Sequence, residues 1–301
     1  MNIFFQQLVN GLTIGGIYAL IALGYTMVYG VMKLINFAHG DLVALAAYIG
    51  LTIFMKVGTS SSGLSILLIV LIGTIMVIVF AGMMLEMIAY RPLRNANAPR
   101  LSAVVSALGA SMVFENGMML LWGPNLKIFP SNILPSTSWS IGSVIVSSAQ
   151  LFIIVSSFVF MLLLHLFINK TKLGTAIRAA AIDQEAAQLM GINVNRVIVT
   201  IFVLGSGLAA IGGIFVGIYY REVYFNMGWL YGLNAFVAAI VGGIGNIPGA
   251  MLGGILLGVF NAFIAGYVSS SWSEAFTFIL LIGILIFRPT GILGERVAEK
   301  V

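Results

Sequence analysis

Charged residues are scarce in this chain. Of its 301 residues, 8% are charged and 60% are hydrophobic, whereas a soluble domain carries about 25% charged residues. So few charges cannot cover a surface that faces water. The composition therefore excludes an ordinary soluble protein and predicts a polytopic membrane protein.

Cysteine is absent, and histidine occurs only twice. The chain therefore has no disulfide and no thiolate metal site. The catalytic patterns His-Glu-x-x-His and Gly-x-Ser-x-Gly do not occur either. The glycine-rich stretch 242–249 lacks the Lys-Ser or Lys-Thr pair of a phosphate-binding loop. We expect a chain that is not an enzyme, holds no metal and binds no cofactor of its own.

Basic residues outnumber acidic ones by 14 to 9, but they form no basic run, so we expect no nucleic-acid partner. They gather instead in three places, 91–100, 170–196 and 288–300. Cytoplasmic loops of membrane proteins are enriched in lysine and arginine, which places all three in the cytoplasm. This arrangement fits nine spans with the N-terminus outside, and it makes 123–146 the main external loop.

Long apolar runs predict spanning helices, because a span needs about 20 apolar residues and lipid favours helices that satisfy their own backbone. We predict an all-α polytopic bundle that forms one transmembrane domain, residues 1–301. The expected spans are 8–32, 40–57, 64–88, 101–122, 147–169, 197–220, 229–244, 247–266 and 269–287. The two spans that flank 242–249 are short and fit broken half-helices, so the count is 8 or 9.

Small residues recur every four positions in two of these spans. The two ladders are Gly205, Ala209, Gly213 and Gly217, and Gly254, Gly258, Ala262 and Gly266. Small side chains let helix backbones approach closely in lipid, where the hydrophobic effect does not drive helices together. We expect both ladders to serve packing and assign them no chemistry.

Polar residues inside a membrane are costly and often functional. Eight positions are candidates for a translocation path: Asn36, His39, Asp41, Glu115, Asn234, Gly245, Asn246 and Asn261. The stretch 36–41 fits either a short cytoplasmic turn with Asp41 as an N-cap or a broken helix that lines the path. The stretch 242–249 fits either a helix interruption near the path or a tight turn at the surface.

The remaining polar positions also leave alternatives open. Glu115 lies well inside a span, where it fits a path residue, a protonated carboxyl or a partner for another helix. Asn234 and Asn261 fit either a path or hydrogen bonds between helices. We expect Glu86 at the membrane interface near Arg91.

The longest polar segment is 170–196, which holds six of the 23 charged residues (14 basic plus 9 acidic). Asp183 suits the N-cap of a short helix, and Glu185 in the first turn suits the helix dipole. Ala186, Leu189 and Met190 share one apolar face of that helix, and Gly191 suits the residue just after its end. The pattern predicts a cytoplasmic helix with one exposed apolar face.

Here the sequence matches a known signature. Residues 185–191 read Glu-Ala-Ala-x-x-x-Gly, which resembles the cytoplasmic loop signature of importer permease subunits of the ATP-binding-cassette (ABC) type, although the usual Ile-x-Leu-Pro continuation is absent. Five stretches resemble the branched-chain amino acid permeases of the LivH/LivM family, most closely its LivH branch. These are 36–40 (NFAHG), 174–179 (GTAIRA), 186–193 (AAQLMGIN), 238–245 (AAIVGGIG) and 288–294 (RPTGILG).

This resemblance implies a permease subunit that pairs with a second, LivM-like permease. It also implies two ATPase subunits, LivG- and LivF-like, which would bind ATP and magnesium at the cytoplasmic face, and a periplasmic amino-acid binding protein. The segment 170–196 would then dock on an ATPase. The residues assigned to this coupling are Gly174, Arg178, Asp183, Glu185, Ala186, Ala187, Leu189, Met190 and Gly191.

The function implied by the resemblance is ATP-driven import of leucine, isoleucine and valine across the bacterial inner (plasma) membrane. An importer of urea, short amides or other amino acids is the alternative within the same architecture. A channel or secondary carrier that works without ATP is the alternative from another class. The shortage of acidic residues in the spans disfavours a carrier driven by protons.

Overall fold

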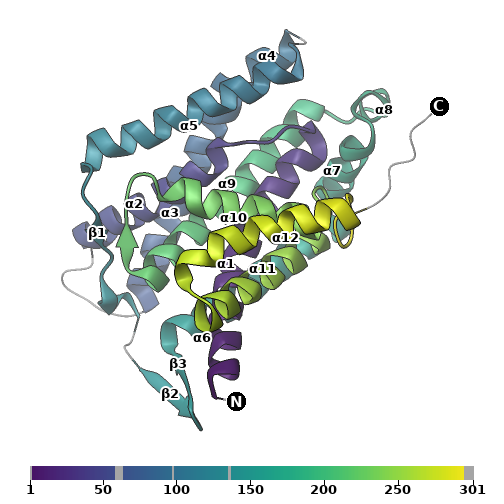
Figure 1. Cartoon of the computed structure of the whole chain (residues 1–301). Coiled ribbons are helices and arrows are strands. Elements are labelled where there is room, and N and C mark those ends of the chain that lie inside the picture. The colour runs from purple at the N-terminus through teal and green to yellow at the C-terminus, as the bar shows by residue number, and fades with distance from the viewer. Residues whose placement is uncertain (1, 58–63, 97, 135–136, 295–301) are drawn as a thin grey trace.

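The computed structural model describes residues 2–57, 64–96, 98–134 and 137–294, and Figure 1 shows a bundle of long helices. The helices are α1 (Asn2–Met32), α2 (Ala38–Val57), α3 (Leu64–Leu85), α4 (Arg91–Asn95), α5 (Arg100–Trp122), α6 (Ser148–Lys170), α7 (Lys172–Ile182), α8 (Gln184–Leu189), α9 (Val194–Tyr220), α10 (Met227–Gly242), α11 (Ile247–Tyr267) and α12 (Ser273–Phe287). Within these residues, eight helices are long and apolar enough to cross a membrane, and α10 is shorter. The predicted all-α polytopic fold is confirmed.

Helix α1 is the element around which the others pack. It runs along α11 and α9, and it also contacts α10 and α6. A Cβ added at Gly258 would lie 2.1 Å from the backbone nitrogen of Gly15, and one at Gly254 would lie 2.4 Å from the Cα of Ala19. Both distances are far shorter than a carbon contact allows, so α1 and α11 cross backbone to backbone. The packing role expected of this ladder is confirmed.

The connection from α1 to α2 returns into the bundle. The Nε2 atom of His39, in the first turn of α2, lies 3.2 Å from the carbonyl oxygen of Ile21. Ile21 is about 16 Å along α1 from its end at Met32, at 1.5 Å per residue. Of the two alternatives for 36–41, the surface turn with Asp41 as N-cap is therefore wrong, because α2 begins at Ala38 and Asp41 is buried within its first turn.

Helix α3 continues past its last α-helical residue toward Arg91 and Arg94. It continues through a π-helical turn, Glu86–Tyr90, into α4. Arg91 and Arg94 therefore lie on a helix rather than in the expected loop, and Glu86 is fully buried instead of interfacial. Across the π turn, both arginines reach back to the carboxylate of Glu86.

The segment between α5 and α6 contains strands that the sequence did not predict. Strands β2 (Ser138–Ile141) and β3 (Val144–Ser147) form an antiparallel hairpin, and β1 (Lys127–Ile128) pairs with β4 (Glu222–Val223). Gln6 of α1 hydrogen-bonds the backbone of Ile145 in both directions. Figure 1 places this hairpin and the start of α1 at one end of the molecule, and α4, α7 and α8 at the other.

That separation agrees with the expected topology, in which 123–146 is external and the first two basic clusters share the opposite side. The third basic cluster begins at Arg288, and residues 295–301, which complete it, lie outside the described residues.

Replacing Gly258 by valine tests the backbone crossing. Two extra branched methyl groups at this position must push α1 and α11 apart, and overpacking of this kind costs about 1–3 kcal/mol or more. We expect a lower midpoint of thermal unfolding in detergent. Gly109→Val on α5 is the matched control, because a Cβ there meets nothing within 4 Å. Equal midpoints of thermal unfolding for Gly258→Val and Gly109→Val would show that α1 and α11 do not cross this closely.

Candidate functional site

The polar segment after α6 folds into two short helices that turn back on the bundle. The Oγ1 atom of Thr171 accepts the Gly174 backbone N–H at 3.0 Å and so caps α7. A Cβ at Gly174 would lie 2.2 Å from the carbonyl oxygen of Ile168, so only glycine lets α7 approach the end of α6 this closely. Arg178 then donates to that same carbonyl at 3.1 Å and to Asn169 Oδ1 at 2.8 Å. Gly174 and Arg178 thus fasten α7 to α6.

Helix α8 has a cap at each end. The Oδ1 atom of Asp183 accepts the backbone N–H groups of Glu185 at 2.9 Å and Ala186 at 3.0 Å. Past the other end, Gly191 has a φ of +84°, and its N–H donates to Gln188 while the N–H of Ile192 donates to Ala187. These two bonds are the Schellman arrangement, which satisfies the last carbonyls of a helix. Both caps predicted from the sequence are confirmed.

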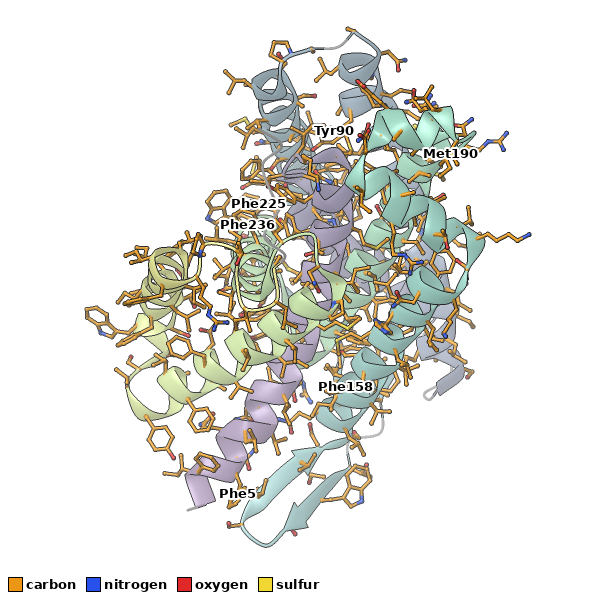
Figure 2. The ribbon with its side chains drawn as sticks, turned by 90° about the vertical axis from the view of Figure 1, so that its right-hand side faces the viewer. Phe5, Tyr90, Phe158, Met190, Phe225 and Phe236 are labelled. Atoms are coloured by element: carbon orange, nitrogen blue, oxygen red, sulfur yellow. The ribbon has the colours of Figure 1, made fainter. Side chains whose placement is uncertain are left out.

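Three large apolar side chains of this segment are exposed beside its polar ones. Leu189 is 89% exposed, Met190 83% and Ile182 88%; we call these three residues the apolar cap. Figure 2 shows Met190 at the opposite end of the molecule from Phe5. Ala186 is also exposed, whereas Ala187 is buried and packs inward. Ile182 was missed from the sequence because it precedes the helix that the pattern outlined.

A side chain that the sequence did not single out fastens α8 to the bundle. The Nε2 atom of Gln184 donates to the carbonyl oxygen of Val31 at 2.7 Å. Val31 lies in the last turn of α1, where carbonyls have no partner within the helix. The bond therefore joins α8, whose last residue belongs to the apolar cap, to the central helix α1. A glutamine in a helical first turn gives no sequence signal for such a distant partner.

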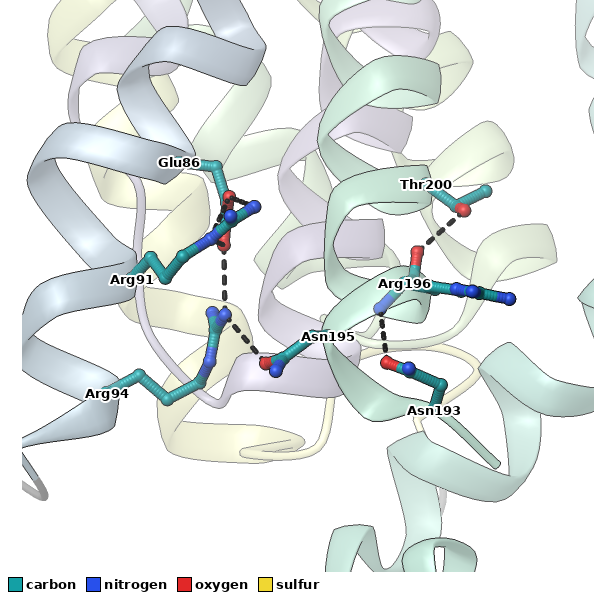
Figure 3. Close-up of polar contacts among 7 residues, drawn as sticks. All are labelled: Glu86, Arg91, Arg94, Asn193, Asn195, Arg196 and Thr200. Carbon is teal, nitrogen blue, oxygen red and sulfur yellow. Dashed lines mark hydrogen bonds and ion pairs between the residues drawn. The ribbon is translucent and has the colours of Figure 1, made fainter. Parts of the chain in front are cut away.

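A cluster of ion pairs around the buried carboxylate of Glu86 lies at the same end of the molecule as α8. The carboxylate of Glu86 accepts from Arg91 Nη2 at 2.6 Å and from Arg94 Nη2 at 3.0 Å. Arg94 Nη2 also donates to Asn195 Oδ1 at 3.0 Å, which ties α4 to the first turn of α9 (Figure 3). Only the Glu86 carboxylate is fully buried, whereas both arginines are partly exposed, so the arginines bring the charge of Glu86 into contact with the solvent-facing side of the cluster. The cluster therefore holds α3, α4 and α9 in one arrangement.

A small cavity of about 40 Å³ joins two of the predicted path residues. Asp41 and Glu115 both line it, together with Ser111, whose hydroxyl donates to Asp41. The remaining lining is Tyr25, Ile35, Phe37, Gly228, Trp229, Gly232, Leu233 and Phe236. The first turns of α2 and α10 meet here, because a Cβ at Gly40 would lie 2.4 Å from the Gly228 carbonyl oxygen. Two carboxylates thus face mostly apolar walls.

The other six predicted path residues do not line this cavity. Asn36 accepts the hydroxyl of Tyr90 at 3.0 Å, His39 faces α1, and Asn234 donates to a carbonyl of its own helix. Asn261 accepts from Thr277 at 2.8 Å, joining α11 to α12. These contacts are structural: they hold helices together or bond a side chain to its own helix.

Gly245 and Asn246 belong to a tight turn between α10 and α11. Gly243 and Gly245 have φ values of +109° and +96°, which favour glycine. The Oδ1 atom of Asn246 accepts the Gly249 N–H at 2.9 Å, and its Nδ2 donates to the Leu293 carbonyl at 2.9 Å. The hydrogen bond to Leu293 therefore holds this turn against the segment that follows α12. Of the two alternatives predicted for 242–249, the structure has the tight turn.

Within the described residues, eight apolar helices that can cross a membrane define the class of multi-pass membrane proteins. Comparison with known families is more specific. The model of the family described as branched-chain amino acid transport system / permease component matches residues 7–285, and the chain belongs to this family. Together with the eight apolar helices, this makes it a multi-pass protein of the bacterial inner membrane.

Curated proteins of the same kind align with this chain over almost its whole length. The chain is 44% identical to the high-affinity branched-chain amino acid transport system permease protein BraD of Pseudomonas aeruginosa, covering 99% of this chain and 98% of that protein. It is 40% identical to the permease protein LivH of Escherichia coli K12 at the same coverage. A probable LivH of Methanocaldococcus jannaschii is 28% identical over 91% of this chain and 88% of that one. No solved structure matches.

Replacing Asp183 by alanine tests the cap of α8. Loss of an N-cap side chain costs about 1 kcal/mol, which corresponds to roughly fivefold faster opening of the helix. Hydrogen exchange of the Ala187 and Met190 amides, both bonded within α8, measures this directly. Asp183→Asn is the matched control, since asparagine caps equally well. Unchanged exchange in the alanine variant would contradict the assigned cap.

Proposed function

We propose that this chain is the transmembrane permease subunit of an ATP-driven importer that carries leucine, isoleucine and valine across the inner membrane. The observation that carries the proposal is the apolar cap. Three large apolar side chains are exposed at the ends of the short helices α7 and α8, at the end of the molecule that holds the first two basic clusters. Burying each against a partner would contribute about 1.5–3 kcal/mol, so the segment is suited to a protein partner.

The contacts of this segment suggest how ATP-derived motion would enter the bundle. No nucleotide-binding motif occurs in the chain, so hydrolysis belongs to a partner that covers the apolar cap. A shift of α8 would pull on α1 through the Gln184–Val31 bond. A shift of α7 would pull on α6 through Arg178. The bundle would thus respond by moving whole helices, as rigid-body transitions do.

The proposed assembly rests on the resemblance to the LivH/LivM family. Two ATPase subunits, LivG- and LivF-like, would bind ATP and magnesium at the cytoplasmic face. A second, LivM-like permease would complete the membrane unit, and a periplasmic binding protein would deliver the amino acid. The relatives are named as permease proteins of transport systems, which supports a multi-subunit complex.

The cavity at Asp41 and Glu115 is the proposed contact for cargo on its path. A carboxylate attracts the ammonium group of an amino acid, and walls such as Phe236 and Leu233 suit an aliphatic side chain. Urea and short amides carry no charge and would gain little from two acidic residues. The cavity therefore favours an amino acid over the alternative cargoes.

Polar replacement of the apolar cap tests coupling. With Leu189→Ser and Met190→Ser together, docking loses two apolar contacts, and we expect uptake of radiolabelled leucine by the reconstituted complex to fall at least about tenfold. Ile128→Ser is the matched control, because Ile128 is 77% exposed at the opposite end. Normal uptake by the well-expressed double variant would overturn the coupling role.

Neutralising the cavity carboxylates tests the path. Asp41→Asn and Glu115→Gln keep the side-chain size but remove the charge that faces an ammonium group. A charged hydrogen bond is worth about 1.5–3 kcal/mol, so each variant should lower leucine uptake by roughly tenfold or more while ATP hydrolysis continues. Ser111→Ala, which keeps the carboxylate but removes its donor, should have a smaller effect. Full uptake by both neutral variants would refute the assigned contact.

A further inference from the structure

An apolar groove lies between α6 and α9, and α3 completes its wall. It has a volume of about 480 Å³, and all of its lining residues are aliphatic, phenylalanine or glycine. Leu163 of this lining is 54% exposed, so the groove opens to the outside of the bundle. Because α3, α6 and α9 are long enough to cross a membrane, this opening faces the hydrocarbon of the bilayer. We call it the α6–α9 groove.

The chain does not fill this groove with its own side chains. Gly207 of α9 is part of the lining, and a Cβ added there would approach Val79 no closer than 3.9 Å. Unfilled space forfeits the dispersion contacts that close packing provides. An apolar occupant would restore those contacts along three helices.

The groove lies within one leaflet of the bilayer. It spans Phe160 to Phe167 on α6 and Val203 to Ile211 on α9, which is roughly 10–12 Å at 1.5 Å per residue. Phe167 lies only three residues before Lys170, the last residue of α6. One leaflet is half of a hydrocarbon core of about 30 Å. An acyl chain matches this depth, whereas a helix of a partner subunit would cross both leaflets.

Basic side chains stand where the groove approaches the membrane surface. Lys170 follows Phe167 by three residues and so neighbours it on α6. Arg196 precedes Val203 by seven residues, almost two full turns, and therefore lies on the same face of α9. Both side chains are exposed, and neither has a hydrogen bond or an ion pair in the described part of the chain. Figure 3 shows the Arg196 guanidinium turned away from Glu86.

The charge of this end of the molecule is positive as a whole. Lys33 and the stretches 86–94 and 170–196 together hold seven basic and three acidic residues, a net charge of +4. Glu86 is already paired with two arginines, and Asp183 caps α8. The free basic side chains at the groove therefore suit an anion. Anionic headgroups attract basic residues at the surface of the cytoplasmic leaflet, with about 1 kcal/mol per residue.

We propose that the α6–α9 groove binds an anionic phospholipid, with one acyl chain in the groove and the phosphate between Lys170 and Arg196. The lipid acts as a wedge that fixes α6 relative to α9. Since Arg178 fastens α7 to the end of α6, the wedge also supports the base of the polar segment 170–196. This site depends on the membrane-spanning fold alone and not on the cargo or the partners of the proposed function.

Native mass spectrometry of the purified full chain measures this binding. The chain is kept in nonionic detergent with equal amounts of phosphatidylglycerol and phosphatidylcholine that carry the same acyl chains. We expect at least about fivefold more phosphatidylglycerol than phosphatidylcholine to stay bound, which corresponds to the attraction of one basic residue. Glycerol phosphate has the charge but no acyl chain and should not displace the lipid. Displacement by glycerol phosphate would assign the site to free phosphate and overturn the proposal.

Filling the groove tests where the acyl chain lies. Gly207→Phe places a ring over the glycine, and we expect this variant to retain one phospholipid fewer than wild type. Gly283→Phe on α12 is the matched control, because a Cβ at Gly283 meets nothing within 4 Å, and it should retain the wild-type number. The same number of lipids on Gly207→Phe as on wild type would contradict the proposed position.

Removing the two charges tests the headgroup contact without touching the groove. Lys170→Gln together with Arg196→Gln should reduce the preference for phosphatidylglycerol at least about fivefold. Arg221→Gln is the matched control, since Arg221 is exposed just past the other end of α9, and it should keep the preference. An equal midpoint of thermal unfolding in lipid-free detergent checks that each variant is folded. An unchanged preference in the folded double variant would overturn the headgroup contact.

The same measurement on the complete complex separates a lipid from a partner helix. If a lipid occupies the groove there, Gly207→Phe again retains one phospholipid fewer than wild type. If the two complexes retain equal numbers while the isolated chains differ, a partner subunit covers the groove, and the lipid is not its occupant in the complex. Leucine uptake does not enter either comparison, so failure of the proposed function would leave this test intact.

Discussion

The structure depends on the close crossing of α1 with α11. In lipid, helices gain nothing from leaving apolar surroundings, so they associate through close packing and hydrogen bonds. Gly15, Gly254 and Gly258 provide this packing, because their backbones meet where any side chain would clash. With α1 fixed in this way, α9, α10 and α6 pack around it.

The same helix connects the two proposed functional regions. Tyr25 of α1 lines the cavity that holds Asp41 and Glu115, and Val31, less than two turns further on, accepts the bond from Gln184 of α8. Under the proposed function, a motion delivered to the apolar cap would reach the cavity through α1. The ion pairs of Glu86 with Arg91 and Arg94 hold the neighbouring helices together at the same end.

Local features were predictable because their causes are local. The caps at Asp183 and Gly191 and the apolar runs of the spans depend on residues next to each other in sequence, and the structure has them as expected. Features that depend on distant partners were not. Glu86 looked interfacial because Arg91 was its only visible partner in sequence, and Asp41 looked like a cap because nothing in the sequence reveals that α2 starts inside the bundle. The role of Gln184 likewise depends on a distant partner, the Val31 carbonyl of α1. Ala187 is buried because it packs inward against the bundle.

If α8 moves α1 through the Gln184–Val31 bond, removing that bond should lower the amount of leucine taken up per ATP hydrolysed. Gln184→Ala deletes the bond to Val31 and leaves the apolar cap intact, while Gln188→Ala changes an exposed residue of the same helix. We expect the complex with Gln184→Ala to keep ATP hydrolysis but to take up less leucine per ATP, and the complex with Gln188→Ala to equal wild type. An unchanged ratio of uptake to hydrolysis in Gln184→Ala would show that the bond does not couple the two helices.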